Sequence, residues 1–298
     1  MLNPIKFITT PEYLSHPRQA LRRFRRLWRP QPPEELIRLP WGAVVLAHTG
    51  ENIGQALYYY GIFDKVVPEA IARLLDPGEV GVEIGANIGQ NCSMMARTAG
   101  PRGRVLAFEP HPEIVLELRQ NVARWNTKQF APVQVEQVAL GESESEAFLD
   151  YGPEFATNRG TASLRSHAGG ESNGASVRVR RLDSYLEEPL SVGVCKIDVE
   201  GHELGVLRGA TGALERGAIR DIVFEDFNPQ PGAVTTLLQQ HGYEIFHLRE
   251  SWLKPLLRPC ADPETAGQPP SHNYLATLDP ARTRQRFQRW GWKCLLGF

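Results

Sequence analysis

Two acidic residues and a glycine-containing turn form the part of this sequence whose residue types best suit chemistry. In VGVEIGANIGQN, Glu83 ends an apolar run, and Gly85 and Gly89 frame the turn that follows. Glu109 ends the next apolar run, twenty residues after Gly89. Glycine lets the backbone approach a ligand without a clashing Cβ, and a carboxylate such as Glu109 can accept hydrogen bonds from both hydroxyls of an adenosine ribose. The pattern predicts a site for an adenosine-containing cofactor.

The composition of this turn distinguishes two classes of cofactor. A dinucleotide favours Gly-x-Gly-x-x-Gly, because the next helix must hold a pyrophosphate at its N-terminus. GANIGQN has Asn87 where the second glycine would stand. S-adenosyl-L-methionine has no phosphate. Glu83 suits its ammonium group, and exposed amides of the turn suit its carboxylate, so we expect this cofactor. The alternatives are a NAD-dependent oxidoreductase and a turn that binds no ligand.

A second cluster of ionisable residues lies in KIDVEGHELGVLRGA. Lys196 and Asp198 alternate at the end of an apolar run, and Glu200 and His202 follow in the turn into a helix. Burying such groups is costly unless they are paired or functional. Asp198, Glu200 and His202 are therefore candidates to take a proton from an acceptor hydroxyl or to position that acceptor. A structural Lys–acid pair with helix capping by Glu200 explains the same residues.

The hydrophobic pattern indicates the elements that position these motifs. Strands are predicted at 80–86, 104–110 and 133–140, and helices at 90–99 and 112–126. This alternation implies parallel βαβ units with right-handed crossovers. In such a sheet the ligand crevice lies beyond the carboxyl ends of the strands, where both acids of the first motif would lie.

The rest of the chain extends this pattern with one interruption. Residues 141–180 are rich in Gly, Ser, Asn and Glu, and their short alternating pieces predict a β-hairpin insertion. Strands are predicted to resume at 192–201 and 219–227, with two more at 243–248 and 273–278. We expect an α/β protein in which the sheet belongs to one domain.

The N-terminal part differs in composition. Residues 1–40 are rich in Pro and Arg and are predicted to form an extension, with a single domain over 41–298 that includes a helix at 51–75. In RQALRRFRRLWRP, arginines alternate with apolar residues. This segment suits a docked terminal helix, or contact with an anionic membrane surface or a protein partner.

Composition excludes several classes of function. The net charge of −1 over 298 residues gives no basic field for nucleic acid. The four cysteines lack metal or redox spacing, which favours a reduced, cytoplasmic compartment. No signal peptide is evident, and no run approaches the ~20 apolar residues that span a bilayer. WGWKC near the end suits core packing or a contact in a homo-oligomer.

The motifs together resemble the FkbM family of S-adenosyl-L-methionine-dependent methyltransferases. The segments that carry the resemblance are VEIGANIGQN, VLAFEPHP, VALGE, RLDSYL, KIDVEGHELGVLRGA and IVFEDF. The resemblance implies a Rossmann-like class I methyltransferase fold, a mostly parallel seven-stranded sheet with an antiparallel last strand. It also implies O-methylation of a small-molecule acceptor, a sugar, polyketide or other secondary metabolite, by in-line transfer. A non-catalytic Rossmann-like interaction module would keep the fold but could lose the acids of the crevice.

The resemblance also implies roles for individual residues. The cofactor-binding residues would be Glu83, Gly85, Ala86, Asn87, Gly89, Glu109, Pro110, Val138, Ala139 and Asp198. The catalytic residues would be Asp198, Glu200 and His202. The acceptor-binding residues would be Asn158, Gly160 and Glu225, with 151–175 as the acceptor loop. The family's first motif usually begins with Asp, and Glu83 keeps that charge. We predict no metal site, although Asp198, Glu200 and Glu225 carry the oxygen ligands that magnesium prefers.

Overall fold

The structure is a computed structural model that describes residues 11–12, 31–152, 155, 159–165, 173–228, 230–260 and 272–296. Three of our expectations fall at least partly on other residues and lie outside this description. They concern the arginine-rich helix of the N-terminal extension, the acceptor-binding residue Asn158 and much of the acceptor loop 151–175.

The central sheet confirms the predicted Rossmann-like fold. Its spatial order is β13 (Pro255–Pro259), β12 (Glu244–Glu250), β14 (Asn273–Thr277), β11 (Ile219–Glu225), β10 (Val192–Ile197), β3 (Val80–Ile84), β4 (Arg104–Phe108) and β5 (Val133–Glu136). The strands from β11 to β5 are parallel, and the last strand, β14, runs antiparallel between β11 and β12. These are the seven expected strands plus one. The edge strand β13 was not predicted, because proline both begins and ends it, although proline is tolerated at sheet edges.

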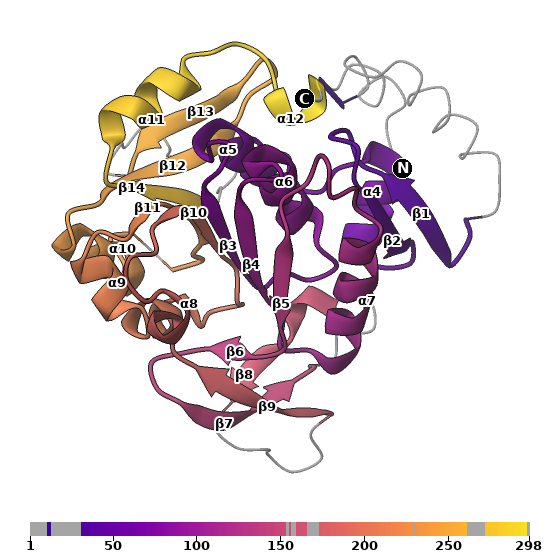
Figure 1. Ribbon diagram of the computed structural model, residues 1–298, viewed down its shortest axis with the longest axis horizontal. Coiled ribbons are helices and arrows are strands. Elements are labelled where there is room, and N and C mark those ends of the chain that lie inside the picture. Colours follow the sequence, from indigo (N-terminus) through magenta and orange to yellow (C-terminus); the bar gives the residue numbers. More distant parts are fainter. Residues whose placement is uncertain are drawn as a thin grey trace.

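Helices cover both faces of this sheet. On one face the buried core includes residues of α5 (Val66–Leu74), α6 (Gln90–Ala99) and α7 (Pro112–Ala123). On the other it includes residues of η2 (Leu182–Tyr185), α8 (Glu203–Arg208), α9 (Thr211–Glu215) and α10 (Ala233–Gln240). Figure 1 shows α8, α9 and α10 on the opposite side of β3 and β4 from α7. The layers therefore leave the ends of the strands free to form a site.

The helix predicted over 51–75 is two helices, α4 (Asn52–Tyr60) and α5. Gly61 ends α4 in the left-handed conformation, with φ 75°, and its N–H donates to the carbonyl of Leu57. This is a common way to end a helix at glycine. The break brings the loop around Asp64 to the mouth of the site described below.

Residues 34–40 pack into the domain, although we expected them in the extension. β1 (Glu34–Arg38) pairs antiparallel with β2 (Val44–His48). Trp41, in the connection between the two strands, is buried, and its indole N–H donates to the Ser93 hydroxyl at 2.9 Å. This hydrogen bond attaches the hairpin of β1 and β2 to α6.

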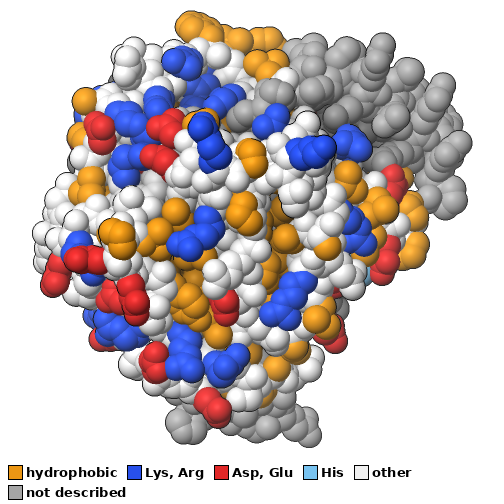
Figure 2. Space-filling model, viewed as in Figure 1, with side chains coloured by type: hydrophobic (Ala, Val, Ile, Leu, Met, Phe, Trp, Pro, Cys, Tyr) orange, Lys and Arg blue, Asp and Glu red, His pale blue; other side chains and the backbone are white. Residues whose placement is uncertain are grey.

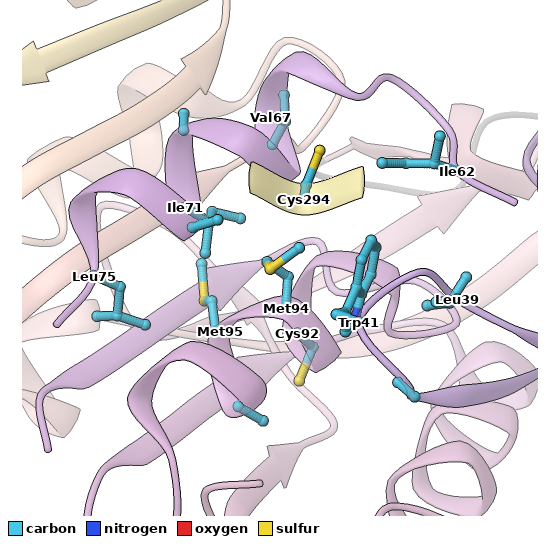
Figure 3. Packing of buried hydrophobic residues seen from close by; sticks show 14 of the residues in the cluster. Leu39, Trp41, Ile62, Val67, Ile71, Leu75, Cys92, Met94, Met95 and Cys294 are labelled. Atoms are coloured by element: carbon cyan, nitrogen blue, oxygen red, sulfur yellow. The ribbon is translucent and has the colours of Figure 1, made fainter. Parts of the chain in front are cut away.

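The C-terminal helices α11 (Pro280–Phe287) and α12 (Lys293–Leu296) return to the same region. Figure 3 shows Cys294 of α12 close to Val67 of α5 and to Met94 of α6. The N–H of Cys294 donates to the buried Glu69 carboxylate at 2.7 Å. Within WGWKC, Trp292 is buried whereas Trp290 is 73% exposed, so the two tryptophans have different surroundings.

The insertion at 141–180 is larger than the predicted hairpin. β7 (Ser145–Asp150) and β9 (Gly174–Arg180) form the hairpin, and β8 (Ser163–Arg165) and β6 (Ala139–Leu140) extend it to a four-stranded sheet. β6 belongs to the segment 133–140 that we predicted as one strand. β5 instead ends at Glu136, and the chain crosses to the second sheet. Figure 1 places this sheet beyond the carboxyl ends of β3, β4 and β5.

Charge is mixed on the surface. Figure 2 shows Lys and Arg side chains interspersed with Asp and Glu on the face drawn there.

Within the part of the chain that the structure describes, no helix has the length and apolarity that crossing a bilayer requires.

Candidate active site

A cavity of about 570 Å³ lies at the carboxyl ends of β3, β4, β10 and β11. Its volume is in the usual range for sites that bind cofactors and small substrates. The turn after β3, the segment after β4, the start of the second sheet and the short helix η1 (Arg159–Thr161) all contribute residues to its lining. The cavity is thus at the crevice that the order of motifs predicted.

Most of the predicted site residues meet in this cavity. The residues that line it are Glu83, Gly85, Ala86, Asn87, Glu109, Pro110, Val138, Ala139, Gly160, Asp198, Glu200 and Glu225. Two predicted residues do not line it, Gly89 and His202. Different contacts keep each of these two residues out of the cavity lining.

Gly89 is required by helix packing and does not reach the cavity. It begins α6 with φ 96°, a conformation that favours glycine. A Cβ on Gly89 would lie 2.7 Å from Cδ1 of Leu118 in α7. We predicted Gly89 as a cofactor-binding residue, and the structure places it against α7 and not in the cavity lining.

His202 packs against its own helix. It precedes α8, and a Cβ built on Gly205 would lie 2.8 Å from the imidazole Nε2. A Cβ on Gly141, at the start of the insertion, would lie 3.4 Å from the same atom. The ring therefore occupies the space between α8 and the insertion, outside the cavity.

Gly85 lets the turn after β3 touch β10. Its φ is 78°, and a Cβ there would lie 1.9 Å from the carbonyl oxygen of Asp198. The strand registers place Gly85, Asp198 and Glu225 in one row and pair Glu225 with Asn273 of β14. This row forms the floor of the cavity on its acidic side.

Glu83 is a buried carboxylate with an unpartnered oxygen. Its side chain is 1% exposed, and Oε2 has no hydrogen-bond partner. Burial raises the pKa of Glu83 to about 8, while Lys196 beside it on β10 opposes the shift. Lys196 itself donates to Oδ2 of Asp198 at 2.9 Å. The free oxygen, in the wall of the cavity, suits the ammonium group of S-adenosyl-L-methionine, so the residues present fit this cofactor.

Glu109 is held rigidly by backbone amides. Oε2 accepts from the N–H of Asn87 at 2.8 Å, and Oε1 accepts from the N–H of His111 at 2.9 Å. Burial raises the pKa of Glu109 and the two amides lower it. Each carboxylate oxygen can accept a further hydrogen bond. The geometry therefore leaves Glu109 able to accept from ribose hydroxyls.

The turn amides do not have the role we expected. Each backbone N–H of residues 85–89 already donates within the protein, to the carbonyls of Phe108 and Ala86 and to the side chains of Asn87 and Glu109. These N–H groups are therefore not free for a ligand carboxylate. Asn87 adopts φ 47° to make this arrangement, which explains why it replaces a glycine without loss of the turn.

Four carboxylates form the other side of the cavity, namely Asp64, Asp198, Glu200 and Glu225. Desolvation, followed by the charges of Asp198 and Glu203, raises the pKa of Glu200 to about 7, although this side chain is exposed to solvent on one side. Desolvation and then Asp198 and Glu200 raise the pKa of Glu225 to about 8. Both groups are therefore poised to exchange protons near neutral pH.

Sequence reasoning missed several residues of this site. Asp64 accepts from the side-chain amide of Asn273 at 2.7 Å and adopts φ 38°. It lay inside the segment predicted as one helix, so no local signal marked it. His111 lines the cavity with Glu109, and its position two residues after that acid was a signal that we did not use. Among the described residues, no group of three or more His, Cys, Asp or Glu side chains is arranged to hold a metal ion.

Comparison with known proteins agrees with this geometry. The model of the methyltransferase FkbM domain matches residues 83–245. The chain is 28% identical over 239 residues to the AMB antimetabolite synthetase AmbE of Pseudomonas aeruginosa, covering 66% of this chain but 11% of AmbE. It is 30% identical over 178 residues to the hexuronic acid methyltransferase AglP of Haloferax volcanii, covering 58% of this chain and 67% of that protein.

Solved structures of methyltransferases match the chain at low similarity. An S-adenosyl-L-methionine-dependent methyltransferase from Agrobacterium tumefaciens matches with a TM-score of 0.43 and 8% identity, covering 83% of this chain and 70% of that one. That likeness is too low to support an argument of its own. The family match spans more than half of the chain and includes both acidic motifs. The protein belongs to the FkbM family of methyltransferases and uses S-adenosyl-L-methionine as its cofactor.

Proposed function

We propose that the protein methylates a hydroxyl oxygen of a small neutral or cationic acceptor, such as a sugar or another secondary metabolite. The observation that carries the proposal is the pair Glu200 and Glu225, whose pKa values of about 7 and 8 lie near neutral pH at the edge of the cofactor cavity. A sugar hydroxyl is a weak nucleophile at this pH and benefits from a positioned base. The name of AglP supports a sugar-derived acceptor for one relative.

The residues of the cavity divide the work. S-adenosyl-L-methionine supplies a methyl group that its sulfonium makes electrophilic. Glu225, at the end of β11, is the group that we assign to take the hydroxyl proton, with Glu200 as its coupled neighbour. Asp198 is held by Lys196, and of the two roles that the sequence suggests for it, base or positioning group, we assign it the positioning of the acceptor. His202 has no part in proton transfer because its ring lies outside the cavity.

The charge of the cavity supports a neutral or cationic acceptor. Lys196 and Arg159 are the Lys and Arg residues in the described lining, and both are already paired. Lys196 pairs with Asp198, and Arg159 pairs with Glu51 and Glu117. A carboxylate on the acceptor would meet the acids of the wall without a free cation. We therefore do not extend the hexuronic acid of AglP to this protein.

Two aromatic rings support an acceptor with an apolar face. Phe63 and Phe227 line the cavity and are 41% and 60% exposed. Sugar rings and hydrocarbon skeletons bury C–H groups against such surfaces, which removes apolar area from water. Hydroxyl groups on the same acceptor would donate to the nearby carboxylates.

The test is a search for the acceptor followed by one substitution. Purified protein with S-adenosyl-L-methionine is incubated with neutral, amino and carboxylated sugars, and products one methyl group heavier are sought by mass spectrometry. With the best acceptor, Glu225→Gln should lower kcat about 10²- to 10⁴-fold. S-adenosylhomocysteine affinity should stay unchanged. Glu215→Gln, an exposed residue of α9, is the matched control.

The pH dependence gives a second readout. The base must be deprotonated, so kcat/KM should rise with pH through an apparent pKa between about 7 and 8, the values of Glu200 and Glu225. Because Glu200 and Glu225 interact, the apparent pKa of this rise is a property of both groups together. Glu225→Gln should flatten the rise. If Glu225→Gln keeps the wild-type rate and pH profile, Glu225 is not the base. If the enzyme prefers carboxylated sugars, the acceptor is not neutral or cationic as proposed.

A further inference from the structure

His111 is a buried side chain with one ring nitrogen engaged and the other without a partner. Nδ1 accepts from the N–H groups of Glu113 at 3.1 Å and Ile114 at 3.3 Å, which caps the start of α7. The side chain is 2% exposed, and Nε2 has no hydrogen-bond partner. The residue nevertheless lines the cofactor cavity. A ligand bound in this cavity could therefore supply the missing hydrogen-bond acceptor for Nε2.

The cap fixes the tautomer of this ring. A nitrogen that accepts two N–H groups must keep its lone pair, so the proton of the neutral ring is on Nε2. Burial lowers the pKa of His111, the nearby Glu113 opposes this shift, and Arg159 adds to it. His111 is thus neutral at pH 7 and carries one buried N–H that has no partner in the protein. Buried donors in native proteins are nearly always hydrogen-bonded.

The position of the ring indicates which half of the cofactor it meets. The backbone N–H of His111 donates to Oε1 of Glu109, the acid that suits the ribose hydroxyls. His111 follows β4, whereas Asp198 and Glu225 follow β10 and β11 on the other side of β3. The ring therefore lies at the nucleoside end of the cavity and away from the acids that we assign to the acceptor.

The insertion holds this ring in place. Tyr151 and Phe155 lie against it, with ring centroids 4.6 and 4.9 Å from that of His111. The two rings also stack on each other at 4.4 Å. Such contacts fix the orientation of a side chain more firmly than burial alone.

We propose that the Nε2–H of His111 donates a hydrogen bond to the adenosine half of S-adenosyl-L-methionine, to a purine nitrogen or a ribose oxygen, and that Tyr151 and Phe155 position the ring for it. The inference adds a binding residue to the cofactor site, and it links the insertion to cofactor affinity. It does not depend on the acceptor proposed above.

Two substitutions separate the cap from the proposed donor. His111→Asn keeps an oxygen that can cap α7, since Asn is among the best capping residues, but it removes the N–H at the Nε2 position. His111→Ala removes both. Affinities for S-adenosylhomocysteine and for 5′-methylthioadenosine, which holds only the nucleoside half, are measured by calorimetry. Melting of the ligand-free protein reports the cap.

His111→Asn should melt close to wild type and bind both ligands about five- to tenfold more weakly, the effect of one lost hydrogen bond. His111→Ala should show the same loss of affinity with a lower melting temperature. Wild-type affinity of His111→Asn for both ligands would overturn the proposal. A loss for S-adenosylhomocysteine alone would also overturn it, because the contact would then involve the amino-acid half.

Spectroscopy on the wild-type protein gives a measurement that no folding defect can obscure. The ¹⁵N resonances of His111 should show the Nε2–H tautomer, and the Nε2 signal should shift when S-adenosylhomocysteine is added. An unchanged signal at saturation would exclude the contact. For the positioning role, Phe155→Leu should weaken S-adenosylhomocysteine binding in wild type but not further in His111→Asn. Additive losses would mean that Phe155 acts independently of the ring.

Discussion

We expect the burial of Glu83 to favour cofactor binding and to lower the stability of the protein without cofactor. It is fully buried, and one of its oxygens has no hydrogen-bond partner. Its ordinary pKa of 4.5 is raised to about 8 in the folded chain, burial being the main cause. Between these pH values the folded state keeps a proton that the unfolded state has released. The free energy of unfolding therefore falls as pH rises across this window.

Glu83→Gln should change stability and affinity in opposite directions. At pH 8 the variant should gain about 1–2 kcal/mol in free energy of unfolding without ligand, with little gain at pH 5. It should bind S-adenosyl-L-methionine roughly tenfold or more weakly, because it loses a charged hydrogen bond to the ammonium group. Chemical denaturation at both pH values and calorimetry measure the two effects. An equally tight complex would mean that the ammonium group binds elsewhere.

The contact between the turn after β3 and the end of β10 decides the shape of the site at the scale of elements. This turn uses its own amides to bind Glu109 and the carbonyl of Phe108, so it acts as a rigid support. The second sheet plays a comparable part on the other side, since residues of β6, β7 and β8 line the cavity. The site is therefore formed by elements that are distant from one another in the sequence.

Gly85→Ala should disrupt this contact. The new Cβ would lie 1.9 Å from the carbonyl oxygen of Asp198, an overlap that no rotation of a side chain relieves. Gly78→Ala is the matched control, since Gly78 also has positive φ, at 90°, but nothing lies within 4 Å of its Cβ position. We expect Gly78→Ala to lower the free energy of unfolding by about 1 kcal/mol.

Gly85→Ala should lower the free energy of unfolding by about 3 kcal/mol or more, or prevent folding. Urea denaturation of the two variants compares them directly. Equal losses would show that the backbone conformation, and not the approach of β10, is what requires glycine at Gly85.

At the scale of the whole molecule, segments near both ends of the chain meet on α5. Lys65, just before this helix, is buried and pairs with Glu12 at 2.6 Å and with Glu250 of β12. The ring of Trp292, near the C-terminus, lies 4.9 Å from the same ammonium group. The described part of the N-terminal region therefore contributes to the stability of the domain, although it supplies no residue to the cavity lining.

Deletion of residues 1–30 tests this contribution. Loss of Glu12 leaves Lys65 with one carboxylate partner, so the free energy of unfolding should fall by about 1–3 kcal/mol. S-adenosylhomocysteine should bind with unchanged affinity, because the two described residues of this segment, 11 and 12, do not line the cavity. Glu12→Gln in the full chain should reproduce most of the loss. A truncated protein that no longer binds S-adenosylhomocysteine would contradict the view that residues 1–30 are separate from the site.

The class of fold and most of the residues that line the cavity could be predicted from the sequence. The parallel strands, the turn with Gly85 and the acids Glu83 and Glu109 depend on local patterns, namely apolar runs and the residues that end them. A local pattern also predicted Asp198, which follows a buried strand, whereas the role of Glu225 was implied by the family resemblance. The β13 strand and the full second sheet escaped prediction because short strands take their stability from neighbours that the local sequence does not specify.

Contacts across the fold determine which side chains line the cavity. Gly89 and His202 have suitable types and positions in sequence, yet packing against α7 and α8 takes them elsewhere. Asp64 and Asn273 are more than two hundred residues apart and meet through a single hydrogen bond. The free Nε2 of His111 arises because a helix cap uses the other nitrogen. Hydrogen-bond partners and burial depend on contacts across the fold, and a local pattern carries no information about them.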